Sequence, residues 1–408
     1  MKICLVTPYS EEGPGGGITR HICNVLDSLH RLNHTVVMIS GLMRTDSPCP
    51  PEVRGTRAVY AKGVPGDTFS PLFWKESLRL FRELDNAVHF DAVISEGSSA
   101  FGLRPALAGR PLIALLQQFK PVHMINSAKG ISGPRSLASY MLRTLPGAAC
   151  DMLRSELYFF RGADKVVCGA RHMLNRAVAL YRIPAERAVY APFYTDRTLF
   201  RRDPCLREEG RRKYGTGGDE FIYLVLGRIQ GTKGISTALE AFRTMRRPGK
   251  RKTRLIIAGG GSERLVSEYR SFAERHGLAV SLTGQAELED LPIIYNAADC
   301  LIMPSPLIEV LPYVILESMS CGLPVLATRM PGNLELLGPG GAYFRPGDPR
   351  ELRVLMEKAA GSAAWLENLA ASGYERASSL FDEAGFRSAM DSALNGAALQ
   401  KSLRAEQA

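Results

Sequence analysis

Short, continuous apolar runs alternate along the chain with longer segments whose apolar residues recur every three or four positions. A run of four to eight apolar residues is typical of a strand buried on both faces, and the longer spacing is typical of a helix with one buried face. One such segment places these residues on a single helix face: Ile18, Ile22, Val25, Leu26 and Leu29. The strand pattern covers Lys2–Pro8, His34–Ser40, Phe90–Gly97, Arg110–Phe119 and Ala163–Ala170. Strands that alternate with helices predict a parallel, doubly wound α/β sheet.

The same alternation begins again after residue 200. The strand pattern returns at Phe221–Ile229, Arg254–Gly261, Ala279–Gly284, Asp299–Ser305 and Pro324–Thr328. Because 408 residues exceed one ordinary core, we expect two α/β domains, of residues 1–195 and 196–378. Residues 379–408 are rich in Ala, Ser and Arg, and they predict a helical segment that packs back toward the first domain.

Composition and charge favour a globular protein with anionic partners. Apolar residues make up 45% of the chain, and no apolar run approaches the length of a membrane-spanning helix or a signal peptide. The net charge of +10 favours nucleotide phosphates or anionic lipid over nucleic acid, for which no motif is present. The basic run Phe242–Leu255 is either a solvated helix end or a membrane-surface patch. The eight cysteines are scattered, which indicates reduced thiols in the cytoplasm.

A glycine-rich turn, Gly13–Gly17, separates the first predicted strand from the first helix. In that position backbone N–H groups and the helix N-terminus can face an anion, although a plain tight turn is the alternative. The turn lacks the dinucleotide fingerprint, because Ile18 stands where a third glycine is needed and no acid follows the second strand. A NAD-dependent oxidoreductase is therefore the weakest of the enzyme hypotheses.

The stretch GRIQGTKG, Gly227–Gly234, directly follows a predicted strand. It is not a Walker loop, because a glycine follows Lys233 where Ser or Thr is needed. Arg228 and Lys233 nevertheless flank a turn that opens a helix. Two such cations could hold a diphosphate, the guanidinium by its fork and the ammonium as a point charge, or they could be ordinary surface residues of a loop.

Two acids eight residues apart, Glu309 and Glu317, lie in a segment that is otherwise apolar. Pro312 suits the first position of a helix and Gly322 suits the residue after its end, so a helix over about Pro312–Cys321 is predicted. Glu309 would precede the free N–H groups of the helix N-terminus, and Glu317 would lie about 7–8 Å farther along the helix. This layout suits a ligand with an anionic middle and hydroxyl-bearing ends. Ordinary acids on an exposed helix face are the alternative.

Together, these motifs resemble those of the retaining glycosyltransferases of family 4, which have the GT-B fold. GRIQGTKG is similar to a family element with the same arginine, lysine and glycine, and LIIAGGGSE is similar to a family strand and glycine turn. EVLPYVILESMSCGLPVLAT resembles the family signature of two glutamates separated by seven residues. The resemblance covers nearly the whole chain, more loosely in its first half. It implies two Rossmann-like domains that face each other across a cleft.

The resemblance also implies which residues bind the donor, a nucleoside-diphosphate sugar for which UDP-sugar is the first choice. Arg228 and Lys233 would bind the diphosphate, Glu317 the ribose, and Glu309 the hydroxyls of the sugar. The other implied contacts are backbone N–H groups of Val310 and Leu311 at the anion, Gly16 and Gly17 approaching the diphosphate from the first domain, and Gly260 and Gln285 near the base and ribose.

The implied reaction transfers the sugar to an acceptor hydroxyl with retention of configuration, without a metal or a cofactor. Arg228 and Lys233 would stabilise the leaving diphosphate together with the helix N-terminus. The acceptor would attack from the same face while the departing phosphate helps to take its proton. Glu309 would then orient and stabilise the sugar, so the implied catalytic residues are Glu309, Arg228 and Lys233. The sequence has no D-x-D pair to bridge a metal to the diphosphate.

The sequence departs from the family pattern on the acceptor side. Gln117 and Gln118 stand where many members have a histidine, and Ser95-Glu96 stands where a histidine is also common. Val310 replaces a frequent glycine. An amide can hydrogen-bond a sugar hydroxyl but cannot act as a base near neutral pH. A non-catalytic nucleotide-sugar-binding protein is therefore an alternative, as is a nucleotide-sugar epimerase of the same fold.

The acceptor is expected to be a glycan, a glycolipid or a small glycoside of cell-envelope or glycoside synthesis. The residues that bind it would lie in first-domain loops such as Ser70–Arg79 and Lys120–Ser136. The second loop is long and basic enough to meet a lipid-linked or anionic acceptor. We expect a cytoplasmic protein, whose contact with the inner face of the cell membrane would be peripheral and salt-sensitive.

Overall fold

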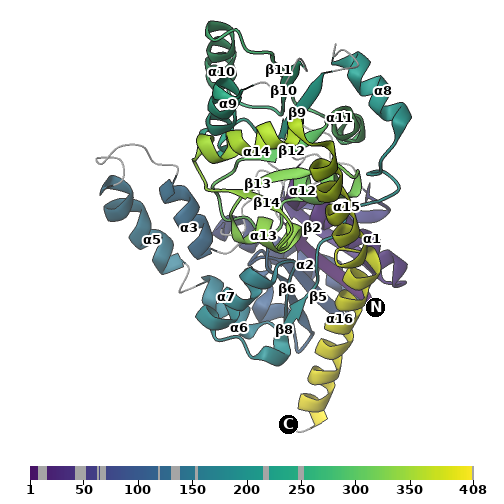
Figure 1. Cartoon of the computed structure of the whole chain (residues 1–408). Coiled ribbons are helices and arrows are strands. Elements are labelled where there is room, and N and C mark those ends of the chain that lie inside the picture. The colour runs from purple at the N-terminus through teal and green to yellow at the C-terminus, as the bar shows by residue number, and fades with distance from the viewer. Residues whose placement is uncertain are drawn as a thin grey trace. The chain divides into compact units, whose positions relative to one another are not determined.

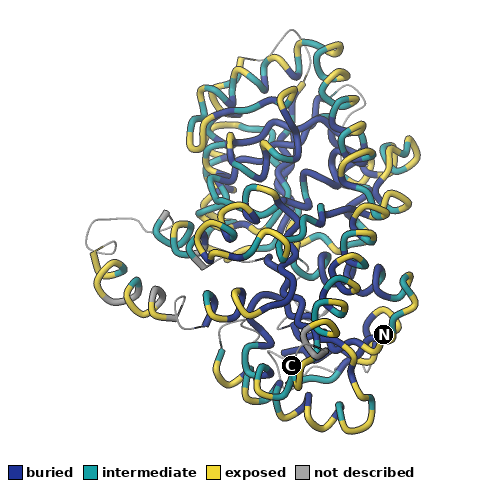
Figure 2. Tube along the Cα trace, turned by 90° about the horizontal axis from the view of Figure 1, so that it is seen from below, coloured by how far each residue is buried: buried dark blue, intermediate teal, exposed yellow. Residues whose placement is uncertain are grey.

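The computed structural model describes residues 1–7, 16–41, 52–61, 64, 70–117, 120–129, 138–151, 155–214, 220–246 and 252–406. The chain divides into two compact units, coloured by residue number in Figure 1. Unit 1 is Met1–Phe193 together with Glu383–Ala408, and unit 2 is Tyr194–Asp382. The C-terminal segment therefore belongs to unit 1. Buried residues gather inside each unit, and exposed residues lie mainly on the outer sides of the helices (Figure 2).

The sheet of unit 1 has its strands in the order β3-β4-β2-β1-β5-β6-β7-β8. Among the described strands of this sheet, only β3 and β4 pair in the antiparallel direction, at one edge of the sheet. The central strand β1 is buried from Ile3 to Thr7, as its continuous apolar run predicts. The strands are β1 (Lys2–Thr7), β2 (Thr35–Gly41), β3 (Glu52–Val53), β4 (Thr56–Ala61), β5 (Ala92–Glu96), β6 (Leu112–Leu115), β7 (Lys165–Cys168) and β8 (Ala188–Tyr190).

The helices of unit 1 pack apolar faces onto this sheet. Helix α1 buries Ile22, Val25, Leu26 and Leu29, so the predicted helix face is confirmed for these residues. The long C-terminal helix α16 packs against α1, β6 and β7. The helices are α1 (Gly17–Arg31), α2 (Pro71–Val88), α3 (Lys120–Lys129), α5 (Leu145–Asp151), α6 (Leu157–Gly162), α7 (Arg171–Tyr181) and α16 (Glu383–Glu406), with shorter turns η1 (Phe101–Ala106), η2 (Tyr140–Thr144) and η4 (Ala185–Arg187).

Both segments predicted as acceptor loops contain helices. Ser70 is the N-cap of α2, where its hydroxyl accepts the N–H of Phe73 at 3.3 Å, and the rest of Ser70–Arg79 is helical. The loop prediction was wrong here because the serine and the proline after it form a helix start. The first ten residues of Lys120–Ser136 form α3, and the remainder lies outside the described residues.

Unit 2 contains an all-parallel sheet in the order β11-β10-β9-β12-β13-β14. Its core joins the central strand β9 to helices α9 and α14, with Tyr223, Leu239 and Met356 among the buried side chains. The strands are β9 (Phe221–Leu226), β10 (Thr253–Ala258), β11 (Val280–Gly284), β12 (Cys300–Met303), β13 (Val325–Thr328) and β14 (Ala342–Phe344). The parallel sheet with helical connections confirms the predicted fold class.

Several helices of unit 2 begin at clear capping residues. The side chains of Asp203, Ser262, Asp348 and Ser362 each accept a hydrogen bond from a first-turn N–H group. The helices are α8 (Pro204–Lys213), α9 (Ile235–Thr244), α10 (Glu263–Arg275), α11 (Leu291–Ala297), α12 (Tyr313–Ser320), α13 (Pro331–Leu337), α14 (Pro349–Gly361) and α15 (Ala363–Ser379), with turns η5 (Gly231–Lys233) and η6 (Leu288–Asp290).

The predicted helix of the two-glutamate segment is α12, with a small difference at its start. Pro312 is the N-cap in extended conformation and not the first helical residue, because the chain turns into the helix only at Tyr313. Gly322 has φ +63°, the left-handed conformation expected after a helix end. Glu309 therefore lies in the loop before α12 and Glu317 lies on the helix, as predicted.

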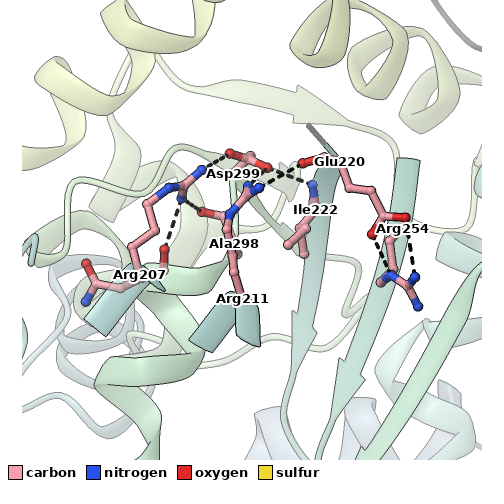
Figure 3. Close-up of polar contacts among 8 residues, drawn as sticks. Arg207, Arg211, Glu220, Ile222, Arg254, Ala298 and Asp299 are labelled. Atoms are coloured by element: carbon pink, nitrogen blue, oxygen red, sulfur yellow. Dashed lines mark hydrogen bonds and ion pairs between the residues drawn. The ribbon is translucent and has the colours of Figure 1, made fainter. Parts of the chain in front are cut away.

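Helix α8 is anchored to the sheet of unit 2 by a cluster of charged groups (Figure 3). The carboxylate of Asp299, just before β12, accepts hydrogen bonds from Arg207 at 2.5 Å, from Arg211 at 2.8 Å and from the N–H of Ile222 at 2.8 Å. Arg254 pairs with Glu220 beside the cluster at 2.9 Å. The cluster thus ties α8 to the N-terminal ends of β9 and β12. The loops that follow the strands lie at the opposite, C-terminal ends.

Candidate functional site

The predicted diphosphate turn is a tightly fixed loop that follows β9. The N–H of Ile229 donates to the carbonyl of Gly260 at 2.7 Å, which joins this loop to the one after β10. Gly234 has φ +74°, and a side chain on it would collide with the carbonyl of Pro304 after β12. The loops after β9, β10 and β12 therefore converge at one edge of the sheet, where parallel α/β sheets bind ligands.

Lys233 and Glu309 form an ion pair within this group of loops. The ammonium Nζ lies 2.6 Å from Glu309 Oε1, and both side chains are about three-quarters buried. Lys233 ends the turn η5, and Glu309 lies in the loop before α12. Arg228 is exposed and has no ion-pair partner among the residues that the structure describes. The structure thus brings the lysine and the first signature acid into direct contact.

The loop that carries Glu309 offers unpaired N–H groups beside this ion pair. Within the described residues, neither the N–H of Val310 nor that of Leu311 has a hydrogen-bond partner. The carbonyl oxygens of Glu309 and Val310 face Gly332, where a Cβ would lie 2.8 and 2.6 Å from them. Because the carbonyls point toward α13, the loop keeps its donors available at the end of α12 that has positive dipole character.

Glu317 is fully buried on α12. The hydroxyl of Tyr295 donates to its Oε2 at 2.6 Å, and the ring of Tyr295 packs edge-on against Phe200. A buried carboxylate requires such partners, so Tyr295 explains how an acid is accommodated in an apolar segment. Tyr295 is not part of any of the motifs that predicted the site.

The two residues predicted near the base and ribose lie side by side. A Cβ on Gly260 would be 3.3 Å from the side-chain Oε1 of Gln285, which follows β11. The N–H of Gly259 also donates to the carbonyl of Gly284 at 2.7 Å. The ends of β10 and β11 are therefore joined at the same edge of the sheet as Lys233 and Glu309.

In unit 1, Gly16 is the N-cap of α1 and Gly17 is its first residue. Because Gly16 has no side chain, it makes no capping bond to the first turn of the helix. The earlier part of the predicted glycine turn, Gly13–Gly15, lies outside the described residues. Helix α1 has no acid in its first turn, so the helix dipole at its start is not neutralised by its own residues.

The residues that replace family histidines in unit 1 lie in a buried environment. Gln117 Nε2 lies 2.7 Å from Nε2 of His21, and the ring of His21 packs against that of Phe193, with centroids 4.7 Å apart and planes tilted by 40°. Burial lowers the pKa of His21 to about 3, so its imidazole is neutral. Gln118 lies outside the described residues.

Glu96, at the end of β5, is fully buried. Its Oε2 has no hydrogen-bond partner within the described part of the chain, and burial raises its pKa well above the usual value. Ser95 has a structural role, because its hydroxyl donates to the carbonyl of Gly97 and accepts from the N–H of Ala100. Burial therefore favours the neutral, protonated form of Glu96.

A hollow of about 590 Å³ lies elsewhere in unit 2 and contains none of the predicted donor residues. Its lining comes from α13, β14, α14, α15 and the loops on either side of α13: Arg329, Leu334, Gly338, Pro339, Gly341, Ala342, Tyr343, Leu355, Lys358 and Trp365. Among the described helices, none is long and apolar enough to cross a membrane.

The fold is that of the GT-B proteins, as comparison with solved structures shows. A structure of WaaG, described as a glycosyltransferase involved in lipopolysaccharide biosynthesis, aligns with a TM-score of 0.72 at 18% identity, over 97% of this chain and 100% of that chain. The Anabaena protein HepE, solved with UDP-glucose, aligns with a TM-score of 0.72 at 20% identity, over 96% and 99% of the two chains. Two Rossmann-like domains make up this fold.

The family follows from the sequence matches. Residues 15–193 match the model of glycosyltransferase family 4, and residues 207–375 match that of glycosyl transferases group 1. The chain therefore belongs to glycosyltransferase family 4, as its motifs suggested.

Curated relatives share only part of their length with this chain. Mannosylfructose-phosphate synthase of Agrobacterium fabrum is 25% identical over 248 residues, which are 58% of this chain and 53% of that protein. Lipopolysaccharide glucosyltransferase WaaG of Escherichia coli K12 is 27% identical over 197 residues, 46% and 52% of the two chains. The chain spans about half the length of the curated relatives it matches.

Proposed function

We propose that the protein is a retaining glycosyltransferase that moves a sugar from a nucleoside-diphosphate sugar to an acceptor hydroxyl. The proposal is carried by the contact of Lys233 with Glu309, beside the unpaired N–H groups of Val310 and Leu311. A cation and free N–H groups suit a diphosphate, and an adjacent carboxylate suits the hydroxyls of the attached sugar. UDP-sugar is the first donor to test, because HepE was solved with UDP-glucose.

The proposed chemistry is stabilisation of a leaving diphosphate. When the sugar–phosphate bond breaks, negative charge grows on the diphosphate, and Arg228, Lys233 and the start of α12 would stabilise it. Glu309 is held by Lys233 and would orient the sugar and stabilise the positive charge that develops on it. The acceptor would attack from the face that the diphosphate leaves, and the departing phosphate oxygen would take the acceptor proton. This route gives retention and needs neither a metal nor a cofactor.

The remaining donor contacts are proposed from the resemblance. Gly260 and Gln285 would lie near the base and the ribose, and Gly16 and Gly17 would approach the diphosphate. Glu317 would bind the ribose with Tyr295 fixing its orientation. Because Glu317 is fully buried, this last contact requires the residues that cover its carboxylate to move when the donor binds.

The proposed acceptor is a glycan, a glycolipid or a small glycoside. The names of the relatives include both a lipopolysaccharide glucosyltransferase and a synthase of a sugar phosphate, which supports either class. In unit 1, Ile125 on α3 and Met141 and Leu142 in η2 are large apolar side chains that are 46–78% exposed. Together with the net charge of +10, they support peripheral contact with the anionic inner face of the cell membrane.

The test is sugar transfer by the purified protein. UDP-glucose and GDP-mannose are each incubated with a sugar phosphate, with a lipid extract from cell envelopes, or with no acceptor, and release of UDP or GDP is measured. We expect nucleotide release that depends on an acceptor, and an α-linked product seen by NMR. In Glu309→Gln the rate of release should be reduced at least ~100-fold, which is the size of effect typical of losing an electrostatic contact in the transition state. A β-linked product would overturn retention.

A non-catalytic nucleotide-sugar-binding protein is the second candidate, favoured by Gln117 and a neutral His21 where a base would be expected. Nucleotide binding without release of UDP or GDP in any of these mixtures would favour it. Conversion of the donor to another nucleotide sugar without an acceptor would instead indicate an epimerase.

A further inference from the structure

The carboxylate of Glu309 is held by more than its ion pair. The hydroxyl of Ser305, which is buried, lies 3.3 Å from the same Oε1 that Lys233 contacts. This hydroxyl also accepts the N–H of Leu307 at 3.3 Å. One serine therefore fixes both the acid and the chain that leads to it, since its hydroxyl is used as donor and as acceptor.

Ser305 is itself held in place by the neighbouring strand. The hydroxyl of Thr328, the last residue of β13, donates to the carbonyl of Ser305 at 2.6 Å. Thr328 is fully buried, and β12 and β13 are paired in register just before this point, Met303 opposite Ala327. The start of the Glu309 loop is therefore attached to a rigid part of the sheet.

Asn333, on α13, completes the chain of hydrogen bonds. Its side-chain Nδ2 donates to the carbonyl of Thr328 at 2.9 Å and to the hydroxyl of Thr328 at 3.1 Å. The preceding residue, Gly332, lies against the carbonyls of Glu309 and Val310. Helix α13 thus contacts the loop at both ends, through Thr328 and Ser305 at one end and through Gly332 at the other.

We propose that Ser305, Thr328 and Asn333 are positioning residues that set the carboxylate of Glu309 for contact with the donor sugar. The inference rests on the proposed function. The bonds run in one direction, from the Asn333 amide to the Thr328 hydroxyl, then through the Ser305 main chain to the Ser305 hydroxyl and Glu309. All three side chains are at most 3% exposed, so water cannot replace a lost member easily.

The arrangement of these residues predicts different effects on the binding of the sugar and of the nucleotide. Glu309 is assigned to the sugar, whereas Lys233 and the N–H groups of Val310 and Leu311 are assigned to the diphosphate. A displaced Glu309 should therefore weaken contact with the sugar and leave binding of the bare nucleotide almost unchanged. A displacement of about 1 Å at a reacting group can reduce a rate by roughly 100-fold.

The experiment compares Thr328→Val, which removes the hydroxyl at nearly constant volume, with Thr328→Ser, which keeps it. Wild type is first screened by thermal shift with UDP, GDP and ADP and with UDP-glucose, GDP-mannose and ADP-glucose. The best nucleotide and its sugar conjugate are then titrated into each variant. We expect Thr328→Val to lose about 10-fold or more in affinity for the sugar conjugate or in its turnover, with less than about 3-fold change for the nucleotide, and Thr328→Ser to restore wild-type behaviour.

A double-mutant cycle separates positioning from general damage. In a Glu309→Gln background, Thr328→Val should have little further effect on the sugar conjugate, because the group that it positions is already removed. Ser305→Ala serves as the second variant if Thr328→Val does not fold, and the same selective loss is expected of it. Equal losses for nucleotide and sugar conjugate, or full effects in the Glu309→Gln background, would overturn the inference while the proposed function stands. If no nucleotide or nucleotide sugar raises the melting temperature of the wild-type protein, the proposed function fails, and the positioning role fails with it.

Discussion

The ammonium of Lys233 lies 2.6 Å from the carboxylate of Glu309, although the two residues are 76 positions apart in the chain. The contact joins the turn after β9 to the loop before α12. It also has a consequence for ligand binding, because a diphosphate and Glu309 would share the same cation. The acid keeps the lysine in place in the free protein, and the lysine prevents Glu309 from being an uncompensated, largely buried charge.

The first prediction concerns the anchor of helix α8. Asp299→Asn should lower the free energy of unfolding by about 3 kcal/mol, because it leaves the largely buried Arg211 and the neighbouring Arg207 without their carboxylate. The matched control is Asp290→Asn, which breaks an ion pair with Lys213 whose side chains are 40–45% exposed. That change should cost less than about 1 kcal/mol. Urea unfolding measures both, and equal effects would contradict a special role of the cluster.

The second prediction concerns the buried carboxylate of Glu317. Tyr295→Phe removes the hydroxyl that donates to it at 2.6 Å, and it should destabilise the protein by about 1–3 kcal/mol, the usual range for loss of a buried hydrogen-bond partner. Tyr374→Phe removes a hydroxyl that is bonded to Arg197 on an exposed side chain, and it should have little effect. Thermal unfolding of the two variants gives the comparison. A Tyr295→Phe protein as stable as wild type would show that Glu317 finds another partner.

The third prediction concerns pH and Glu96. Its folded-state pKa is raised above the ordinary 4.5, so the folded protein keeps a proton that the unfolded chain releases. The contribution of this group to the free energy of unfolding therefore decreases as pH rises above about 4.5. The decrease is up to about 1.4 kcal/mol per pH unit until the folded-state pKa is reached. Glu96→Gln should be more stable than wild type at about pH 8 and similar to it near pH 4. If the difference in free energy of unfolding between Glu96→Gln and wild type were constant across this range, it would contradict a raised pKa of Glu96.

The fourth prediction concerns pH and His21, with the opposite sign. Its folded-state pKa is lowered from 6.5 to about 3, so below pH 6.5 the unfolded chain binds a proton that the folded protein does not. Stability should fall as pH drops from 6.5 toward 3, by up to about 1.4 kcal/mol per pH unit. His21→Gln should lack this part of the acid dependence, whereas His276→Gln, at an exposed helix end, should keep it. Urea unfolding at several pH values tests the slopes.

Much of the fold could be predicted because its strands are short apolar runs between amphipathic helices. The sheet order, which joins β1 to β5 and β9 to β12, could not, because it depends on contacts far apart in sequence. Helix α8 showed no apolar pattern, since it is a polar helix attached by Arg207 and Arg211. Its start could have been found from Asp203 followed by Pro204, a good N-cap and first-turn pair.

The candidate site shows the same limit. The motifs identified Lys233 and Glu309 separately. The pattern of Pro312 and Gly322 correctly predicted that Glu309 lies in the loop before α12. Their direct contact is a tertiary feature that neither motif contains. Tyr295 was missed because a single buried hydroxyl has no sequence signature. Its importance becomes visible only when the atom it donates to is known.

The most direct test of the whole account is binding of nucleoside diphosphates to wild type and to Lys233→Ala, with Lys213→Ala as the control. Lys213 also forms an ion pair at 2.7 Å, but with Asp290 and away from the proposed site. Calorimetric titration with UDP, GDP and ADP should show one nucleotide binding wild type and Lys213→Ala equally, and binding Lys233→Ala at least ~10-fold more weakly, as expected for the loss of a charge-assisted contact. Binding of none of the three, or equal binding to all three proteins, would contradict the donor site proposed at Lys233 and Glu309.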